Sequence, residues 1–202
     1  MHRGRAVTLE PLDVAHAPDL WEAARDAEAS WAYLRYGPFP DAGSFARHVE
    51  SLAQRQDQPF WAVRPASSGR AEGWLSLCDI YPSDAAIEIG SIWFSPRLQR
   101  TRAATEAVVL LMRHAFDELG YRRLVWRCQT VNAASARAAA RYGFRPEGVW
   151  RAAAVVKGVQ RDVAWFSLLS EEWPARRAAL EAWLDDENFG AEGRARRALE
   201  RA

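Results

Sequence analysis

The chain has 202 residues, of which 49% are hydrophobic and 26% are charged, as in ordinary globular domains. Its 27 basic side chains nearly balance 26 acidic ones, so composition gives no sign of a nucleic-acid or anionic-membrane ligand. No run of eighteen apolar residues occurs, the four histidines lack metal-ligand spacing, and Cys78 and Cys128 lie in separate strand-like segments. We expect a cytoplasmic protein with free thiols, no metal and no membrane contact.

The first quarter of the chain predicts one strand and two helices. Residues 7–11 alternate like a strand, and Asp13 can cap a helix that runs to about Glu28. An aromatic segment, residues 31–40, contains a Gly-Pro pair that breaks any long helix. Asp41 or Ser44 then starts a second helix that continues to residue 52.

Hydrophobic spacing continues to alternate between strand and helix through the rest of the chain. The expected elements are strands over 60–64, 72–81 and 87–94, a helix over 104–119, a strand over 124–130, a helix over 132–142, and strands over 145–151 and 162–169. The pattern predicts one α+β domain with a mixed sheet over residues 1–174. A helical tail over 175–202, with Leu180, Trp183 and Leu184 as its apolar stripe, either packs on that domain or forms a homodimer.

Two strand-to-helix junctions carry the polar residues of a candidate site. The loop over residues 96–107 leaves an apolar strand and opens a long amphipathic helix, whose first N–H groups can bind phosphate. The second junction places Asn132 and Ser135 at the start of the next helix. Together the junctions indicate a nucleotide-containing cofactor beside a reacting centre. The alternative is a solvated basic loop that only caps a helix.

Several short motifs occur in a fixed order between about Arg5 and Pro174. They are Glu88-Ile89-Gly90, the loop Gln99–Ala104 with Thr105-Glu106-Ala107, Asn132-x-x-Ser135, Tyr142-Gly143-Phe144 with Glu147-Gly148, and Arg161-Asp162 with Trp165-Phe166-Ser167 and Glu172-Trp173-Pro174. In order and spacing the chain resembles the GNAT superfamily of N-acetyltransferases, specifically its RimJ/RimL-like branch. The resemblance implies a largely antiparallel central sheet, split at a V-shaped opening and flanked by helices.

The resemblance also implies acetyl-CoA as cosubstrate, with its pyrophosphate on the loop that opens the long helix. The implied cofactor-binding residues are Gln99, Arg100, Thr101, Arg102, Ala103, Ala104 and Thr105 in that loop, Asn132, and the main chain of Ile92, Trp93 and Phe94. The family pattern is Gln/Arg-x-x-Gly-x-Gly/Ala, and Arg102 stands where the family has its middle glycine. Arg102 either shifts the loop or adds a cation to the phosphates.

Acetyl transfer needs a neutral amine, a polarised thioester carbonyl and a proton for the departing thiolate. Many superfamily members donate that proton from a tyrosine, but the matching position here is Ala139. The branch resemblance makes Ser135 the proton donor or the partner of the sulfur; otherwise Asn132 is an N-cap and Ser135 an ordinary N3 residue. Glu88 is the first candidate for general base and Asp79 the second, although strand-end acids commonly form salt bridges.

The absence of an evident strong base favours an acceptor amine of low pKa. At pH 7 roughly 10% of an α-amine with a pKa near ~8 is neutral, against ~0.04% of a lysine near ~10.4. We therefore predict an N-acetyltransferase acting by direct attack in a ternary complex, with a protein N-terminal α-amine favoured. The alternatives are a small-molecule amine acetyltransferase and a non-catalytic acyl-CoA-binding regulatory module. Aromatic residues 31–39 form an acceptor lid or, for at least half of them, part of the core.

Overall fold

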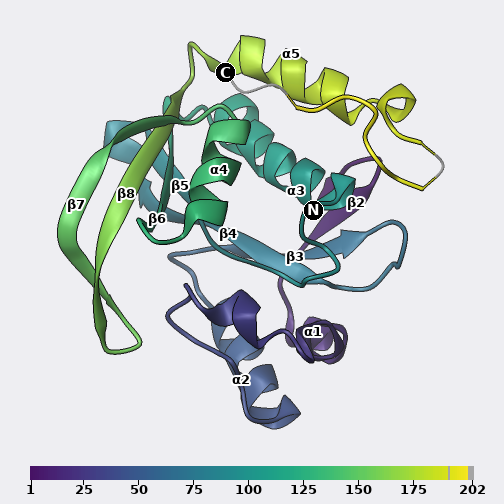
Figure 1. Cartoon of the computed structure of the whole chain (residues 1–202), viewed down its shortest axis with the longest axis vertical. Helices are drawn as coiled ribbons and strands as arrows, with labels where there is room; N and C mark the ends of the chain where they lie inside the picture. The colour runs from purple at the N-terminus through teal and green to yellow at the C-terminus, as the bar shows by residue number, and fades with distance from the viewer. Residues whose placement is uncertain (191, 200–202) are drawn as a thin grey trace. The chain divides into compact units, whose positions relative to one another are not determined.

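The computed structural model describes residues 1–190 and 192–199, coloured from purple to yellow along the chain in Figure 1. Contacts between Cα atoms divide the chain into two compact units. Unit 1 comprises residues 1–80 and 89–111, and unit 2 comprises residues 81–88 and those from 112 onwards. The strand β5 (Ala86–Phe94) and the helix α3 (Arg102–Arg113) each contribute residues to both units.

Unit 1 contains an antiparallel sheet. Its strands are β1 (His2–Arg3), β2 (Val7–Pro11), β3 (Phe60–Pro65), β4 (Gly73–Tyr81) and the second part of β5, in that order. Its helices are α1 (Ala17–Ala24), α2 (Ala42–Ala53) and the first part of α3, with 3-10 turns η1 (Val14–His16) and η2 (Glu28–Trp31). The predicted first strand and the β3–β4 hairpin are confirmed.

The predicted first helix is shorter than the sequence pattern indicated. Asp13 does act as a cap, because the Ala15 N–H donates to Asp13 Oδ1 at 2.8 Å, but it caps the 3-10 turn η1. The helix α1 then begins at Ala17 and ends at Ala24, shortly before Asp26 adopts a left-handed φ of 56°. The expected end near Glu28 was therefore wrong. Of the two candidate caps for α2, Asp41 is the one that accepts the Ser44 N–H, at 2.7 Å.

An aromatic cluster fills the core of unit 1. Trp31, Trp74 and Trp93 are each 1% exposed or less, and the rings of Trp31 and Trp93 stack 4.5 Å apart at 11°. Tyr36 and Phe39 are partly buried against this cluster. The interpretation of the aromatic segment as core packing is confirmed for these residues, whereas Tyr33 is 43% exposed.

Unit 2 contains the parallel part of the sheet. Its strands follow the order β5, β6 (Arg123–Gln129), β8 (Val159–Leu169) and β7 (Arg145–Val156). The pairing of β5 with β6 is parallel and covers Ala86↔Arg123 to Glu88↔Val125, whereas β6–β8 and β7–β8 are antiparallel. The predicted mixed, largely antiparallel α+β fold is thus confirmed; the V-shaped opening stays a prediction.

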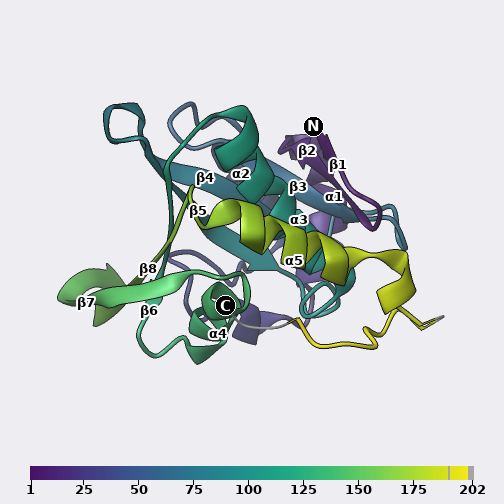
Figure 2. The same ribbon diagram turned by 90° about the horizontal axis from the view of Figure 1, so that it is seen from above.

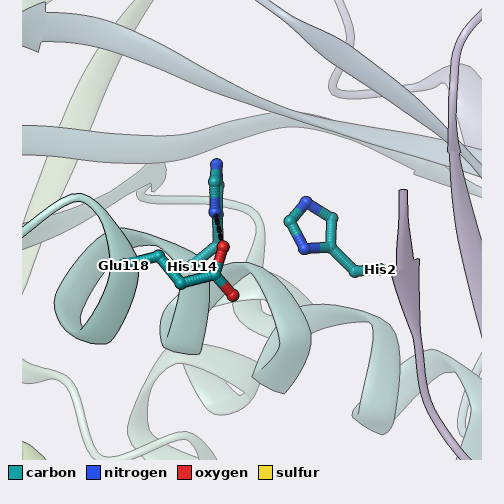
Figure 3. Close-up of side chains that lie close together, drawn as sticks. All are labelled: His2, His114 and Glu118. Atoms are coloured by element: carbon teal, nitrogen blue, oxygen red, sulfur yellow. Dashed lines mark hydrogen bonds and ion pairs between the residues drawn. The ribbon is translucent and has the colours of Figure 1, made fainter.

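The helices of unit 2 are α4 (Ala133–Arg141) and α5 (Trp173–Leu184), with short helical turns η3 (Pro82–Asp84) and η5 (Asp186–Asn188). A π-helical turn, η4 (His114–Glu118), continues α3, and in it His114 Nδ1 lies 2.7 Å from Glu118 Oε2 (Figure 3). Within the described residues, none of the helices is long and apolar enough to cross a bilayer.

The β7–β8 hairpin is longer than predicted. Its pairing continues to Val156↔Val159, whereas β6 pairs with β8 only as far as Val163, so the hairpin runs on past β6 (Figure 2). The turn is made by Lys157 and Gly158, both at positive φ, as their place in the sequence indicated. Val149 and Trp150 on β7 are more than half exposed.

The helix α5 packs against η4 within unit 2. Trp173 is 3% exposed, its ring stacks 5.2 Å from that of Phe116, and its indole N–H donates to Asp117 Oδ1 at 2.7 Å. Leu180 and Leu184 are buried, as predicted for the apolar stripe, and Trp183 is half-buried with its indole N–H donated to the Arg197 carbonyl. Packing burial of this kind contributes about 1.5–3 kcal/mol per large side chain.

Candidate active site

The second part of β5 contains a kink at Ser91, which lies in unit 1. Ser91 adopts a left-handed φ of 49°, a conformation that costs a non-glycine residue about 1–3 kcal/mol and persists only where its surroundings enforce it. The enforcing group is Gln58, a buried side chain whose Nε2 donates to Ser76 Oγ at 2.8 Å and to Ser91 Oγ at 2.9 Å. Ser76 Oγ in turn donates to the Gly90 carbonyl at 2.9 Å. This buried network holds the strand kinked.

The three residues after the kink were predicted to hold a pantetheine arm through their main chain. The Trp93 side chain points into the aromatic core, where its indole N–H donates to Ser30 Oγ at 3.0 Å. Ile92 and Phe94 are half-buried and lie on the other face of the strand. The side chain of Trp93 therefore anchors the strand, and any ligand contact of this residue is left to its main chain.

The loop after β5 folds on itself before α3 begins. The Ser95 carbonyl accepts the N–H groups of Leu98 and Gln99, both at 3.0 Å, and Gln99 Nε2 donates to the Phe94 carbonyl at 2.9 Å. Arg100 adopts a left-handed φ of 64°. These bonds fix a compact turn that delivers the chain to the N-terminus of α3.

Thr101 caps that N-terminus. Its Oγ1 accepts the Ala104 N–H at 3.1 Å, so one of the amides expected to bind phosphate is already bonded within the loop. In the described part of the chain, the amides of Arg100 and Ala103 have no hydrogen-bond partner, and the Arg97 and Arg100 side chains are exposed. The anion-binding capacity of this terminus therefore rests on those two amides, the helix dipole and nearby cations.

Arg102 fits its position without backbone strain. It is the first residue of α3 and has helical geometry; the left-handed residue of the loop is Arg100. The glycine of the family pattern is therefore not needed here for its conformational freedom. Thr105, also predicted to bind cofactor, has a fully buried side chain whose Oγ1 donates to the Thr101 carbonyl at 3.2 Å.

In unit 2 the second junction matches the expected geometry. Asn132 caps α4, because its Oδ1 accepts the Ser135 N–H at 3.1 Å. Ser135 Oγ also accepts the indole N–H of Trp126, on β6, at 2.9 Å. Burial raises the pKa of the Cys128 thiol, and a hydrogen bond from Ser135 acts in the opposite direction. The cap role of Asn132 is confirmed, and the catalytic role of Ser135 stays a prediction.

The position of the tyrosine acid used by other superfamily members is filled by Ala139, which is fully buried. Tyr142 is 3% exposed, packs its ring 5.8 Å from that of Trp126, and accepts a hydrogen bond from Arg141. Tyr142 is thus a core residue of unit 2, as its place next to Gly143 indicated.

Glu88 does not join Ser135. Its carboxylate is buried, forms an ion pair with Arg127 Nε, and pairs in register with Val125. Because side chains alternate along a strand, residues 125 and 127 share one face of β6, whereas Trp126, the partner of Ser135, occupies the other. Asp79, the second candidate base, lies in unit 1, is exposed and has a left-handed φ of 43°.

Sequence reasoning did not single out Gln58, Ser91, Trp126 or Arg127. A signal for Trp126 and Arg127 was present, because an indole and a guanidinium occupy consecutive positions between apolar residues in the middle of the strand. Arg127 also lies over the Trp165 ring, 4.7 Å from its centroid. A polar group in such a strand needs a partner when buried, and here the partners are Ser135 for Trp126 and Glu88 for Arg127, both predicted site residues.

Known proteins resemble this chain over most of its length. A family model for the acetyltransferase (GNAT) domain matches residues 6–145. The Bacillus subtilis protein YdaF, which carries the name of a ribosomal N-acetyltransferase, is 30% identical over 171 residues, which cover 84% of this chain and 92% of YdaF.

Solved structures agree with this match. A GCN5-related N-acetyltransferase from Brucella melitensis has a TM-score of 0.95 and 43% identity, covering 98% of this chain and 91% of its own. An acetyltransferase structure of the GNAT family from Chromobacterium violaceum has a TM-score of 0.80 and 45% identity over 85% of this chain and 87% of its own. The chain therefore belongs to the GNAT family of N-acetyltransferases.

Proposed function

We propose that this acyltransferase moves an acetyl group from acetyl-CoA to a primary amine by direct attack in a ternary complex. In this reaction a C–N bond forms and the thioester C–S bond breaks. The amine nitrogen loses one proton and the departing thiolate gains one. The observation that carries the proposal is Ser135, whose hydroxyl is held at the N-terminus of α4 by Asn132 and Trp126.

The N-terminus of α3 would hold the pyrophosphate. The amides of Arg100 and Ala103 are the donors that the loop leaves for an anion, and the exposed guanidinium groups of Arg97 and Arg100 supply charge. The main chain from Ile92 to Phe94, fixed by the kink at Ser91, would hold the pantetheine arm. A fixed main-chain donor at the thioester carbonyl contributes about 3 kcal/mol to acyl transfer.

Ser135 is the proposed proton donor to the thiolate, and Asn132 orients it. The base assignment of Glu88 is weakened by its ion pair, because Arg127 Nε already donates a hydrogen bond to one of the two carboxylate oxygens, Oε2. An enzyme without a strong base favours an acceptor that is already neutral in part at pH 7, which supports an α-amine over a lysine. The name that YdaF carries, that of a ribosomal N-acetyltransferase, supports a protein as the acceptor.

The experiment compares two peptides of equal length with acetyl-CoA. One has a free N-terminus and no lysine; the other has a blocked N-terminus and one lysine. We expect CoA release and a mass gain of one acetyl group on the first peptide, with much slower reaction on the second. A reversed preference refutes the α-amine assignment. No heat with CoA in calorimetry, together with no product, refutes acetyl-CoA as the donor.

A second candidate is a non-catalytic acyl-CoA-binding module. It is favoured by one observation, the buried Ala139 at the position of the usual tyrosine acid. Tight CoA binding without product from any amine of a broad panel, including spermidine, amino acids and aminoglycosides, would support this candidate and exclude catalysis. Turnover with one of the small amines instead of peptides would support a small-molecule acetyltransferase.

A further inference from the structure

The indole of Trp126 contacts the proposed proton donor directly. Trp126 Nε1 lies 2.9 Å from Ser135 Oγ, and the Trp126 side chain is 5% exposed. A buried indole N–H must be hydrogen-bonded to avoid a cost of about 1–3 kcal/mol, and Ser135 Oγ is its partner in this structure. This hydrogen bond therefore restricts the position of the Ser135 side chain as well as that of the Trp126 ring.

The Trp126 ring has little freedom to move. It packs against the rings of Tyr142, at 5.8 Å, and Phe144, at 5.7 Å, on the side of α4. Its strand β6 pairs with β8 in antiparallel register, where Trp126 lies opposite Phe166, and the parallel pairing with β5 ends one residue earlier, at Val125. The indole donor is thus held by two ring contacts and by the β6–β8 pairing.

Ser135 is constrained from two directions. Asn132 Oδ1 binds its main-chain N–H at 3.1 Å, and Trp126 binds its side-chain oxygen. A hydroxyl has one proton, and with the indole occupying one lone-pair direction that proton must point elsewhere. A hydroxyl that accepts a hydrogen bond is also a better donor, because linked hydrogen bonds polarise one another.

We infer that Trp126 is a positioning residue for acetyl transfer: its indole N–H fixes the Ser135 hydroxyl as a donor to the departing sulfur. This inference rests on the proposed function of Ser135. Trp126 does not touch the reacting atoms, and it acts only through the serine. Loss of the indole N–H should therefore lower kcat, since the thiolate develops in the transition state and not in the bound thioester.

Trp173 provides a matched control in the same unit. It is also a buried tryptophan, 3% exposed, with its indole N–H donated to an oxygen, Asp117 Oδ1, at 2.7 Å. Trp126→Phe and Trp173→Phe each remove one such hydrogen bond and a similar ring volume. We expect both variants to lose thermal stability, but only Trp126→Phe to lose activity.

The measurements are the melting temperature, the CoA affinity by calorimetry, and kcat and KM with the peptide that has a free N-terminus. For Trp126→Phe we expect kcat to fall about 10- to 100-fold, the size of effect seen when a supporting hydrogen bond is removed, with KM for acetyl-CoA changed less than about 3-fold. Ser135→Ala should lower kcat at least as much. The double variant should equal Ser135→Ala alone, because the indole acts through the hydroxyl.

Each outcome decides the inference. Equal kcat values for Trp126→Phe and Trp173→Phe, or additive effects of Trp126→Phe and Ser135→Ala, overturn it. If Trp126→Phe does not fold, benzothienylalanine at position 126 replaces the ring N–H by sulfur while keeping the ring shape, and the same fall in kcat is expected. Absence of wild-type turnover refutes the proposed function together with the inference, whereas wild-type turnover with an unaffected Trp126→Phe variant refutes the inference alone.

Discussion

Glu106, in the middle of a motif that pointed to cofactor binding, has a structural partner in the N-terminal segment. Its carboxylate is 7% exposed and accepts two main-chain N–H groups, from Arg5 at 2.8 Å and from Ala6 at 2.6 Å. The contact is close, since a Cβ built at Gly4 would lie 2.3 Å from Glu106 Cδ. The carboxylate therefore fastens the start of the chain to α3.

The substitution Glu106→Gln keeps the side-chain size and removes the charge. It replaces one acceptor oxygen by an NH₂ group, which then faces an N–H donor. A hydrogen bond to a charged group contributes about 1.5–3 kcal/mol, and both are affected, so we expect a loss of about 2–4 kcal/mol in the free energy of unfolding. For a chain of this length that corresponds to a fall of roughly 5–15 °C in melting temperature.

The assay is thermal unfolding followed by circular dichroism, with hydrogen exchange of the Arg5 and Ala6 amides as a local readout. Glu181→Gln serves as control, because Glu181 forms an exposed i,i+4 ion pair with Arg177 at 2.8 Å and such pairs contribute about 0–1 kcal/mol. A Glu106→Gln variant as stable as Glu181→Gln, with both amides still protected, would show that the carboxylate does not anchor the N-terminus.

Three further predictions concern other polar groups that are buried or half-buried. Glu88→Gln should destabilise the protein by about 2 kcal/mol in urea unfolding, because Arg127 loses its charged partner; full turnover of the variant from about pH 6 to 9 would exclude Glu88 as the base. Burial lowers the pKa of His48 to about 4, so stability present above an unfolded pKa of about 6.5 should be lost as pH falls towards 4. The loss should be about 1–2 kcal/mol, because this ring is only half-buried. If the free energy of unfolding of His48→Phe depends on pH as steeply as that of the wild type, the prediction is wrong. Gln58→Leu should remove the support of the kink at Ser91 and raise KM for acetyl-CoA at least about 3-fold; an unaltered KM would show that the network does not position the strand.

Local signals in the sequence predicted most elements of the fold. Asp13, Asp41 and Asn132 each cap the turn or helix that follows. These caps could be predicted because the capping bond joins atoms only two or three residues apart in the sequence. The strands and the β3–β4 hairpin follow from alternation and turn residues, which are equally local. The left-handed residue at Asp26, which precedes the predicted end of the first helix, has no comparable signal.

The order of short motifs also identified the family and the two strand-to-helix junctions. The sequence could not show that Thr101 would occupy the Ala104 amide, or that Arg102 would fit the glycine position without strain. Both depend on how the loop turns, and the left-handed conformation falls on Arg100 instead. The conformation of such a loop is set by bonds to the strand before it, including the one from Gln99 to the Phe94 carbonyl.

Only the tertiary structure showed that Glu88 and Ser135, two of the three predicted catalytic residues, do not meet. Glu88 and Arg127 are 39 residues apart in the chain, and they meet because β5 and β6 pair in a parallel register. A shift of one residue in that register would bring Glu88 to the face that Trp126 and Ser135 share. Alternation within each strand can be read from the sequence, but the register between strands is decided by the packing of the whole sheet. That packing gives Glu88 an ion pair with Arg127 and gives Ser135 a hydrogen bond from Trp126.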